Sequence, residues 1–299
     1  MKKFLITGGC GFVGSHMAEK LVNDGHDVTI IDDLTTGKKE NIQSISDKVK
    51  LFHGDIRNVD LMKECIKNQD GVFHFAAKAS VPESFQNPEE YYDVNVRGTQ
   101  NVFQKAMEEG IKVVYASSSS VYGNQNKMPI KENFPFNPIN PYAKTKVDCE
   151  KLASTFAQKK LQVIGMRFFN IFGERQSMNY AGVITLFLDR IRKNLPPKIN
   201  GDGSQIRDFV FVKDIVEANY MAMESNVSHE FFNVGTGHST SILELANTVI
   251  EISKLDISPE FSEPLQGDIK ESIADVELIT KKIGWNPKVF LKEWLMTKI

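Results

Sequence analysis

Cysteine is scarce in this chain, and the few cysteines lie far apart. The 299 residues include three cysteines, Cys10, Cys65 and Cys149, and no two of them form a CxxC pair. The six histidines are scattered, without the spacing that metal ligands require. We therefore expect neither a disulfide framework nor a bound metal.

An excess of charge of one sign and long apolar runs are also missing. Lys and Arg number 36 against 38 Asp and Glu, so the formal net charge is −2. This balance supplies no basic field to hold nucleic acid or an anionic membrane. No apolar run approaches the roughly 18 residues of a membrane span, and the opening MKKFLITGG is too short an apolar run for a signal peptide. We expect a soluble, cytoplasmic protein without a nucleic-acid or membrane partner.

The sequence does contain a regular alternation of short β-rich runs and helix-length segments. Apolar runs cover residues 4–7, 28–31, 50–53, 72–75 and 113–116. Helical patterns cover about 12–23, 61–68 and 88–108. Continuous apolar runs are typical of parallel strands that are buried on both faces. The order predicts an α/β fold with a Rossmann-type, doubly wound parallel sheet.

The later part of the chain is less regular and predicts a smaller α/β lobe. Further strands are expected at 163–166 and 231–234, and further helices at about 182–194 and 242–255. We expect residues 1–165 to form the nucleotide-binding domain and residues 166–299 to form mainly a substrate-binding lobe. The chain is expected to return to the larger domain near 205–235.

A glycine-rich turn joins the first expected strand to the first expected helix. Gly8, Gly11 and Gly14 are spaced three apart in TGGCGFVG at 7–14. Such glycines allow a close approach of backbone to ligand, and the helix N-terminus offers free N–H groups to a diphosphate. The second strand ends at Asp32 and Asp33, where a carboxylate accepts hydrogen bonds from the adenosine ribose and repels a 2′-phosphate. The pattern predicts bound NAD rather than NADP.

A tyrosine and a lysine stand one turn apart at the start of another expected helix. Tyr142 and Lys146 are at i and i+4 within PYAKTK, so they share one helical face. An ammonium beside a phenol favours the phenolate, which can take the proton of a sugar hydroxyl. The serine run SSSSVYG at 117–123 follows a strand, at the edge where open α/β sheets carry reactive residues. A serine hydroxyl there can bond the same substrate oxygen.

With further motifs along nearly the whole chain, these features resemble the extended short-chain dehydrogenase/reductase family. The sequence is most similar to its NAD-dependent nucleotide-sugar epimerase/dehydratase group, of the UDP-glucose and UDP-N-acetylglucosamine 4-epimerase type. The motifs are TGGCGFVGSH, Asp32-Asp33, GDI at 54–56, FAA at 75–77, NVRGT at 95–99, SSSSVYG, PYAKTK, RFFN at 167–170, RDF at 207–209, NVG at 233–235 and GW at 284–285.

The resemblance implies a role for each matching residue. Ser118, Tyr142 and Lys146 would be catalytic, with Tyr142 as the base and Lys146 as its partner. The implied NAD contacts are Gly8, Gly11, Phe12, Val13, Gly14, Asp32, Asp33, Leu34, Thr36, Gly37, Asp55, Ile56, Phe75, Ala76, Ala77, Lys78, Asn95, Tyr142, Lys146 and Phe169. The implied substrate contacts are Ser118, Asn170, Arg175, Val183, Phe187, Arg207, Asp268 and Ser272.

The implied reaction inverts C4 of a UDP-sugar through a transient 4-keto sugar. Tyr142 would take the C4 hydroxyl proton while the C4 hydride passes to NAD and later returns to the opposite face. The expected substrates are UDP-glucose and UDP-galactose, and the N-acetylhexosamine pair is a further possibility. In relatives, helices that match 91–108 and 142–159 form a four-helix bundle across a dimer twofold, so a homodimer is expected.

Departures from relatives at four positions bear on the reaction. In the similar sugar 4,6-dehydratases, the positions of Ser119 and Ser120 hold an acid/base pair. In the similar uronate decarboxylases, the position of Ser120 holds a glutamate. The two serines therefore favour plain epimerisation. Leu265 stands where 4-epimerases usually have a diphosphate-binding arginine, a loss of roughly 1.5–3 kcal/mol if nothing replaces it. Ser272 stands where some relatives have a bulky tyrosine, which leaves room for an N-acetyl group at C2.

Other readings of the same residues stay open. A UDP-uronate 4-epimerase is one, because some of these enzymes carry a similar serine run. A nucleotide-sugar 4-ketoreductase is another, and it would consume NAD(P)H stoichiometrically. A non-catalytic dinucleotide sensor is more remote, since it would need the glycine turn but not Ser118, Tyr142 and Lys146.

Overall fold

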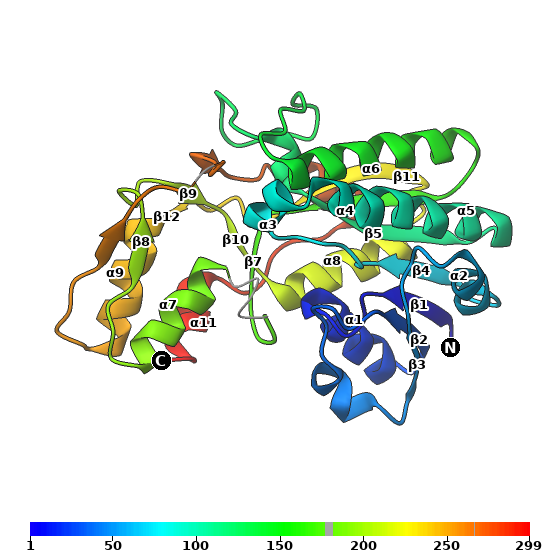
Figure 1. Cartoon of the computed structure of the whole chain (residues 1–299), viewed down its shortest axis with the longest axis horizontal. Helices are drawn as coiled ribbons and strands as arrows, with labels where there is room; N and C mark the ends of the chain where they lie inside the picture. The colour runs from blue at the N-terminus through cyan, green and yellow to red at the C-terminus, as the bar shows by residue number, and fades with distance from the viewer. Residues whose placement is uncertain (177–181, 266) are drawn as a thin grey trace.

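The computed structural model describes residues 1–176, 182–265 and 267–299. A parallel sheet of seven strands forms the larger part of the molecule (Figure 1). The strands are β1 (Lys3–Thr7), β2 (Asp27–Asp32), β3 (Val49–His53), β4 (Gly71–His74), β5 (Lys112–Ser118), β6 (Val163–Phe168) and β11 (His229–Val234). Their order is β11-β6-β5-β4-β1-β2-β3. The predicted Rossmann-type fold is confirmed, and the order reverses between β1 and β4.

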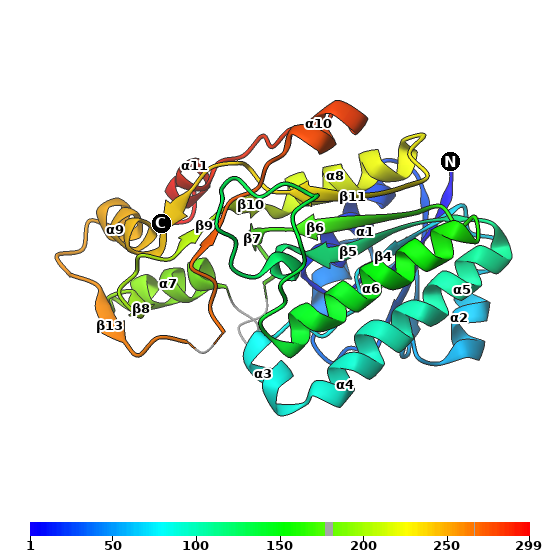
Figure 2. The same cartoon turned by 90° about the horizontal axis from the view of Figure 1, so that it is seen from above.

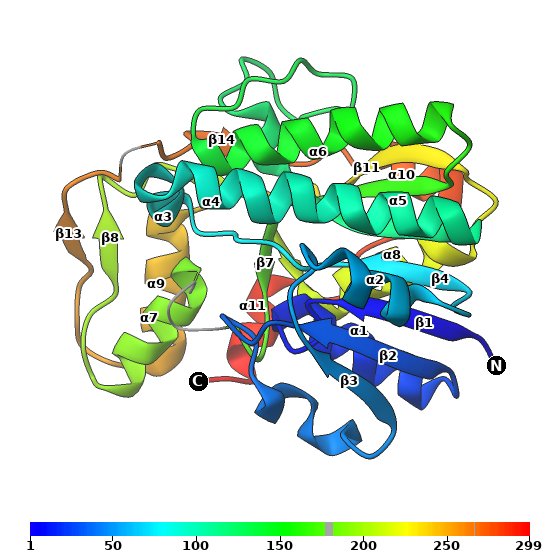
Figure 3. The ribbon, with the colours of Figure 1, turned by 45° about the vertical axis from the view of Figure 1, so that its right-hand side comes forward.

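Helices cover both faces of this sheet, which explains the continuous apolar runs. The first face is covered by α1 (Phe12–Asn23) and α8 (Val212–Glu224), and the second by α2 (Val59–Ile66), α5 (Thr99–Glu109) and α6 (Pro141–Gln158) (Figure 3). Along β1, Phe4 and Ile6 pack into the core of the first face, while Leu5 packs into the core of the second. Since successive side chains point to opposite faces, a strand covered on both sides needs apolar residues at every position.

The helix expected over 88–108 is interrupted rather than regular. It begins as α4 (Pro88–Tyr92), passes through a π-helical turn, η2 (Asp93–Gly98), and continues as α5. A short helix, α3 (Val81–Gln86), precedes it, and a 3₁₀ helix, η1 (Lys39–Ile45), follows β2. Neither short helix was expected, because each is too short to show a period in its apolar residues.

The smaller lobe lies beside the sheet and has its own apolar core (Figure 1). It contains the helices α7 (Val183–Arg192), α9 (Ile242–Ser253) and α11 (Leu291–Met296). Short strands form three small sheets: β7 (Asn170–Phe172) with β10 (Phe209–Phe211), β8 (Lys198–Asn200) with β13 (Glu260–Ser262), and β9 (Ile206–Arg207) with β12 (Thr240–Ser241) and β14 (Glu271–Ser272). Phe172, Phe187, Leu245 and Trp294 are among its buried core residues.

The chain passes between the two parts more than once. After β9 and β10 it returns as α8 and β11, and later as α10 (Glu277–Ile283), which contacts β11. The boundary expected at residue 165 falls inside β6. Both α8 and β11 lie within residues 205–235, where the chain was expected to return. Among the described residues, no helix is both long enough and apolar enough to cross a bilayer.

Candidate active site

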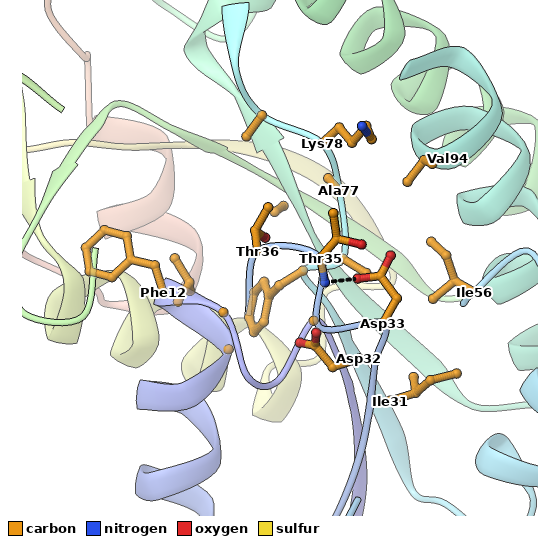
Figure 4. Close-up of a pocket in the computed structure, with 18 of the residues that line it drawn as sticks. Phe12, Ile31, Asp32, Asp33, Thr35, Thr36, Ile56, Ala77, Lys78 and Val94 are labelled. Atoms are coloured by element: carbon orange, nitrogen blue, oxygen red, sulfur yellow. Dashed lines mark hydrogen bonds between the residues drawn. The ribbon is translucent and has the colours of Figure 1, made fainter. Parts of the chain in front are cut away.

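A cavity of about 520 Å³ lies where the parallel strands end, at the reversal of strand order (Figure 4). This is the position where open α/β sheets bind their ligands. Of the residues with predicted site roles, those that line the cavity are Gly8, Gly11, Phe12, Val13, Gly14, Asp32, Asp33, Thr36, Asp55, Ile56, Phe75, Ala76, Ala77, Lys78, Ser118, Tyr142, Lys146, Phe169 and Arg175.

The glycine turn forms a cradle that side chains would fill. A Cβ on Gly14 would lie 2.1 Å from the Gly8 carbonyl oxygen, and one on Gly8, at φ +69°, would lie 2.8 Å from the Ala76 nitrogen. The following helix, α1, has no side-chain hydrogen bond at its N-cap, Gly11, and no acidic residue in its first turn. Its N–H groups and positive dipole end therefore face the cavity without a competing carboxylate, which suits the diphosphate of NAD.

The two aspartates that follow β2 differ in their surroundings. The Asp32 carboxylate accepts hydrogen bonds from the backbone N–H groups of Cys10 and Leu34, each at 2.8 Å. Burial raises the pKa of Asp32, and these two hydrogen bonds act against that shift. Asp33 accepts the Thr35 N–H at 2.9 Å and lies near Ile56, on the side of the cavity opposite Phe12 (Figure 4). This edge therefore carries two carboxylates and no phosphate-binding arginine from the same loop, which fits the ribose of NAD.

Leu34 and Gly37 shape this edge through the backbone. Leu34 has a positive φ of 60°, and its N–H bonds to Asp32. A Cβ on Gly37 would lie 2.7 Å from an Asp32 carboxylate oxygen. A side chain at residue 37 would therefore displace the carboxylate, so Gly37 leaves space for Asp32 while the Leu34 N–H binds it.

Asn95 sits behind the cavity wall rather than on it. It is buried, and its amide both accepts from the Lys78 N–H at 2.8 Å and donates to the Lys78 carbonyl at 2.9 Å. It also donates to the Thr145 hydroxyl of α6 at 3.0 Å. The π turn that carries Asn95 thereby clips the loop after β4 to the helix that carries Tyr142.

The start of α6 is fixed by its cap and by the strand beneath it. Asn140 caps the helix by accepting the Ala143 N–H at 2.8 Å, and Pro141 occupies the first turn. The buried Lys146 donates to the Ala116 carbonyl at 2.8 Å, and its Nζ lies 5.8 Å from the centre of the Tyr142 ring. The expected pairing of phenol and ammonium on one helical face is therefore present.

Ser118 ends β5 and lines the same cavity as Tyr142. Its hydroxyl oxygen accepts the Ser120 N–H at 3.2 Å. This bond occupies a lone pair and leaves the hydroxyl proton free to be donated elsewhere. Ser118 is thus set up as a donor toward an oxygen in the cavity.

His74 lies at the end of β4, beneath this arrangement, and is fully enclosed. Its two ring nitrogens bond to the hydroxyls of Thr7, at 2.6 Å, and Thr99, at 2.8 Å. Burial, aided by the nearby Lys146 charge, lowers the pKa of His74 to about 3. The imidazole is therefore neutral, and it connects β1, β4 and α5.

Three of the predicted substrate residues come together in the smaller lobe. Arg207 lies opposite Ser272 in the pairing of β9 with β14, and its guanidinium bonds to the Asp268 carboxylate at 2.5 Å. Arg207 and Ser272 are buried. The segment that carries Asp268 also reaches the larger part of the molecule, because the Lys270 N–H donates to Asn124 at 2.9 Å.

The other predicted substrate residues are placed differently from one another. Asn170 begins β7, and its N–H donates to the Asp208 carbonyl at 3.0 Å. Arg175, at φ +70°, lines the glycine-turn cavity and pairs with Glu19 of α1 at 2.7 Å. Val183 begins α7 and is partly buried, whereas Phe187 is buried in the core of the smaller lobe. The Phe187 side chain therefore contacts that core.

Several residues that line the cavity were not predicted. They are Ile31, Thr35, Lys38, Asn41, Gly54, Arg57, Ala79, Glu90, Val94, Ala116, Ser117, Phe168, Ile171 and Gln176. Asn41 shows why: it belongs to η1 and donates to the Cys10 carbonyl at 2.8 Å, so it clamps the glycine turn from 31 residues away. Its position depends on a short helix that folds back, for which the sequence carries no periodic signal.

The fold and this cavity define a Rossmann-type enzyme that uses NAD. A family model described as the NAD-dependent epimerase/dehydratase family matches residues 4–235, and the chain belongs to that family.

Comparisons with individual proteins agree with this. The UDP-glucose 4-epimerase of Mycolicibacterium smegmatis is 37% identical over 97% of this chain and 95% of its own. The UDP-N-acetylglucosamine 4-epimerase of Methanobrevibacter ruminantium, solved with UDP-N-acetylmuramic acid, has a TM-score of 0.94 at 37% identity and covers 99% and 96% of the two chains. The UDP-glucose 4-epimerase of Thermotoga maritima, solved with UDP-glucose, has a TM-score of 0.94 at 34% identity and covers 99% and 97%.

Proposed function

We propose that this protein inverts C4 of a UDP-sugar, with NAD as its resident cofactor and a 4-keto sugar as the transient species. The observation that carries the proposal is that Ser118, Tyr142 and Lys146 line one cavity together with the glycine turn. The names of the similar proteins support the same chemistry. When bound, NAD supplies a hydride acceptor and donor, which is what the oxidation and reduction of C4 require.

The proton steps belong to residues of this chain. Tyr142 takes the proton of the C4 hydroxyl and returns it after the sugar has turned. Lys146, fixed by the Ala116 carbonyl, places a positive charge 5.8 Å from the centre of the Tyr142 ring. Ser118, with one lone pair occupied by the Ser120 N–H, donates a hydrogen bond to the C4 oxygen and holds that oxygen beside Tyr142.

The diphosphate of the substrate is held in the smaller lobe. Arg207 is the proposed cationic contact of this diphosphate and Asn170 is a further proposed contact, whereas Arg175 is proposed to help clamp the nucleotide. Arg207 is paired with Asp268, so a diphosphate must share or replace this carboxylate. A tether of this kind keeps the 4-keto sugar bound while its ring turns over, which inversion requires.

Two serine positions define the range of substrates. Ser272 is small and lies beside Arg207, so we propose that both UDP-hexoses and UDP-N-acetylhexosamines are accepted. Ser120, buried behind Ser118, has no carboxylate to remove a C5 proton, so dehydration is not expected. Leu265 is exposed and supplies no charge to the diphosphate.

We also propose a homodimer. The helices α5 and α6 run side by side across the second face of the sheet (Figure 2), where a second copy can pack to form a four-helix bundle.

A panel of UDP-sugars followed by NMR tests the function. UDP-glucose, UDP-GlcNAc and UDP-glucuronate are incubated separately with the holoenzyme, and the C4 epimer is measured. The proposal expects epimers of the first two and loss of activity by at least a hundredfold in Tyr142→Phe. A matched variant, Tyr92→Phe, removes the hydroxyl of an exposed tyrosine on α4 and should keep full activity. Turnover of UDP-glucuronate alone, or an unchanged Tyr142→Phe, would overturn it.

A further inference from the structure

A row of polar residues crosses three neighbouring strands beneath α6. Ser117 of β5 lies opposite Arg167 of β6, which lies opposite Asn233 of β11. All three residues are buried. Polar side chains that are buried at the same register of these strands, of which β11 is the edge of the sheet, must be satisfied by hydrogen-bond partners.

Glu150 of α6 supplies the main partner for this row. Its side chain is 1% exposed and that of Arg167 is 3% exposed. The carboxylate accepts two bonds from the Arg167 guanidinium, at 2.9 and 2.6 Å, and a third from the Ser117 hydroxyl at 2.5 Å. A buried carboxylate needs this degree of compensation, and a bidentate arginine fixes its direction as well as its charge.

The network continues from Arg167 to the loop after β5. Arg167 donates to the Tyr122 hydroxyl at 2.6 Å, and Tyr122 donates to Asn233 at 2.7 Å. The Asn233 amide donates in turn to the Ile130 carbonyl at 2.8 Å. The serine run that contains Ser118 is therefore held at both ends, by Ser117 and by Tyr122.

We infer that Glu150 and Arg167 are positioning residues that set the distance between Tyr142 and Ser118; this inference rests on the proposed function. Tyr142, Lys146 and Glu150 are spaced four residues apart along α6, so their side chains lie on one face of the helix. Two of them are tied to consecutive residues of β5, Lys146 to the Ala116 carbonyl and Glu150 to the Ser117 hydroxyl. The first residue of the face, Tyr142, then projects toward the cavity from a helix with a fixed register on that strand.

This arrangement separates catalysis from binding. In the part of the chain that the structure describes, Ser117, Glu150 and Arg167 make no hydrogen bond to Arg207 or to the glycine turn, and of the three only Ser117 is among the residues that line the cavity. A shift of Tyr142 relative to Ser118 slows proton transfer. A misplacement of about 1 Å lowers the rate by on the order of a hundredfold, and a smaller shift lowers it less. The substrate diphosphate and NAD keep their own contacts.

The test uses Ser117→Ala, which removes one bond to Glu150 and leaves the ion pair in place, and Glu150→Gln, which removes the charge. The inference expects kcat to fall by about tenfold in Ser117→Ala and about a hundredfold in Glu150→Gln, with KM within twofold of wild type. Ser117→Thr, which keeps the hydroxyl, should restore most of kcat. The matched control is Lys112→Met, at the other end of β5. The buried Lys112 ammonium donates to two carbonyls in the last turn of α8 and to the Ser225 carbonyl just after it. This control variant should lower the melting temperature and leave kcat unchanged.

Crystal structures of the same variants make the outcome independent of the substrate. A shift of Tyr142 relative to Ser118 in Ser117→Ala and Glu150→Gln supports the inference even if no UDP-sugar is epimerised, in which case only the proposed function fails. An unshifted pair, or an unchanged kcat in Glu150→Gln when the wild type epimerises UDP-glucose, overturns the positioning role. A fall in kcat equal to that of Lys112→Met at matched loss of stability would overturn it as well.

Discussion

His74 makes the stability of this protein depend on pH in a way that can be calculated. Its imidazole is 3% exposed and bonds to two threonine hydroxyls, and burial lowers its pKa from 6.5 to about 3. In the unfolded chain the ring takes up a proton near pH 6.5, whereas in the folded protein it stays neutral to much lower pH. Stability from this group is therefore complete above pH 6.5 and is lost progressively as the pH falls from there toward 3.

The size of the effect follows from the two pKa values. Each pH unit below 6.5 costs about 1.4 kcal/mol until the folded group also titrates. Between pH 7.5 and pH 5, His74 should therefore remove about 2 kcal/mol from the free energy of unfolding. A glutamine at this position keeps one donor and one acceptor for the two threonines and does not titrate.

Urea unfolding at pH 7.5 and pH 5, with NAD at equal excess, measures this contribution. His74→Gln should lose about 2 kcal/mol less than wild type between the two pH values. The control His238→Gln removes an exposed imidazole and should lose as much as wild type. The reasoning is wrong if His74→Gln and wild type lose the same free energy.

Other predictions concern the cofactor, the diphosphate and assembly. Gly14→Ala should weaken NAD binding at least tenfold in calorimetry, because its Cβ would lie 2.1 Å from the Gly8 carbonyl oxygen. The control Gly25→Asn, in open space at φ +81°, should bind NAD normally. Leu265→Arg should lower KM for UDP-glucose by about tenfold, equivalent to about 1.4 kcal/mol, with kcat unchanged; an unchanged KM would show that this residue does not face the diphosphate. Sedimentation at micromolar concentration should give a dimer, and a monomer would exclude the bundle of α5 and α6.

Local signals in the sequence were sufficient for the larger sheet and for α1. The apolar runs and the glycine turn depend on neighbours in sequence, and β1 to β5 begin and end within about two residues of the predicted bounds. The first helical pattern was predicted to end at about residue 23, and α1 ends at Asn23, with Gly25 at a positive φ shortly after it. These features follow from periodicity and from glycine chemistry alone.

Features that depend on distant partners were not predictable in the same way. The π turn at η2 depends on Asn95 reaching the backbone of Lys78. The strands β9 and β14 have two residues each, too few for an alternating pattern, and they exist because residues 65 apart in sequence pair. Phe187 was an implied substrate contact, but its side chain is buried in the core of the smaller lobe. This burial depends on the packing of α7 against α9.

The central claim is that the hydride removed from C4 returns to the same sugar. UDP-glucose carrying deuterium at C4 tests this most directly, with the product isolated and the label located by NMR and mass spectrometry. We expect UDP-galactose with the deuterium fully retained at C4, because in the proposed reaction the 4-keto sugar turns over without leaving the cavity. Loss of the label to solvent or to free cofactor, or a product without inversion, would contradict it.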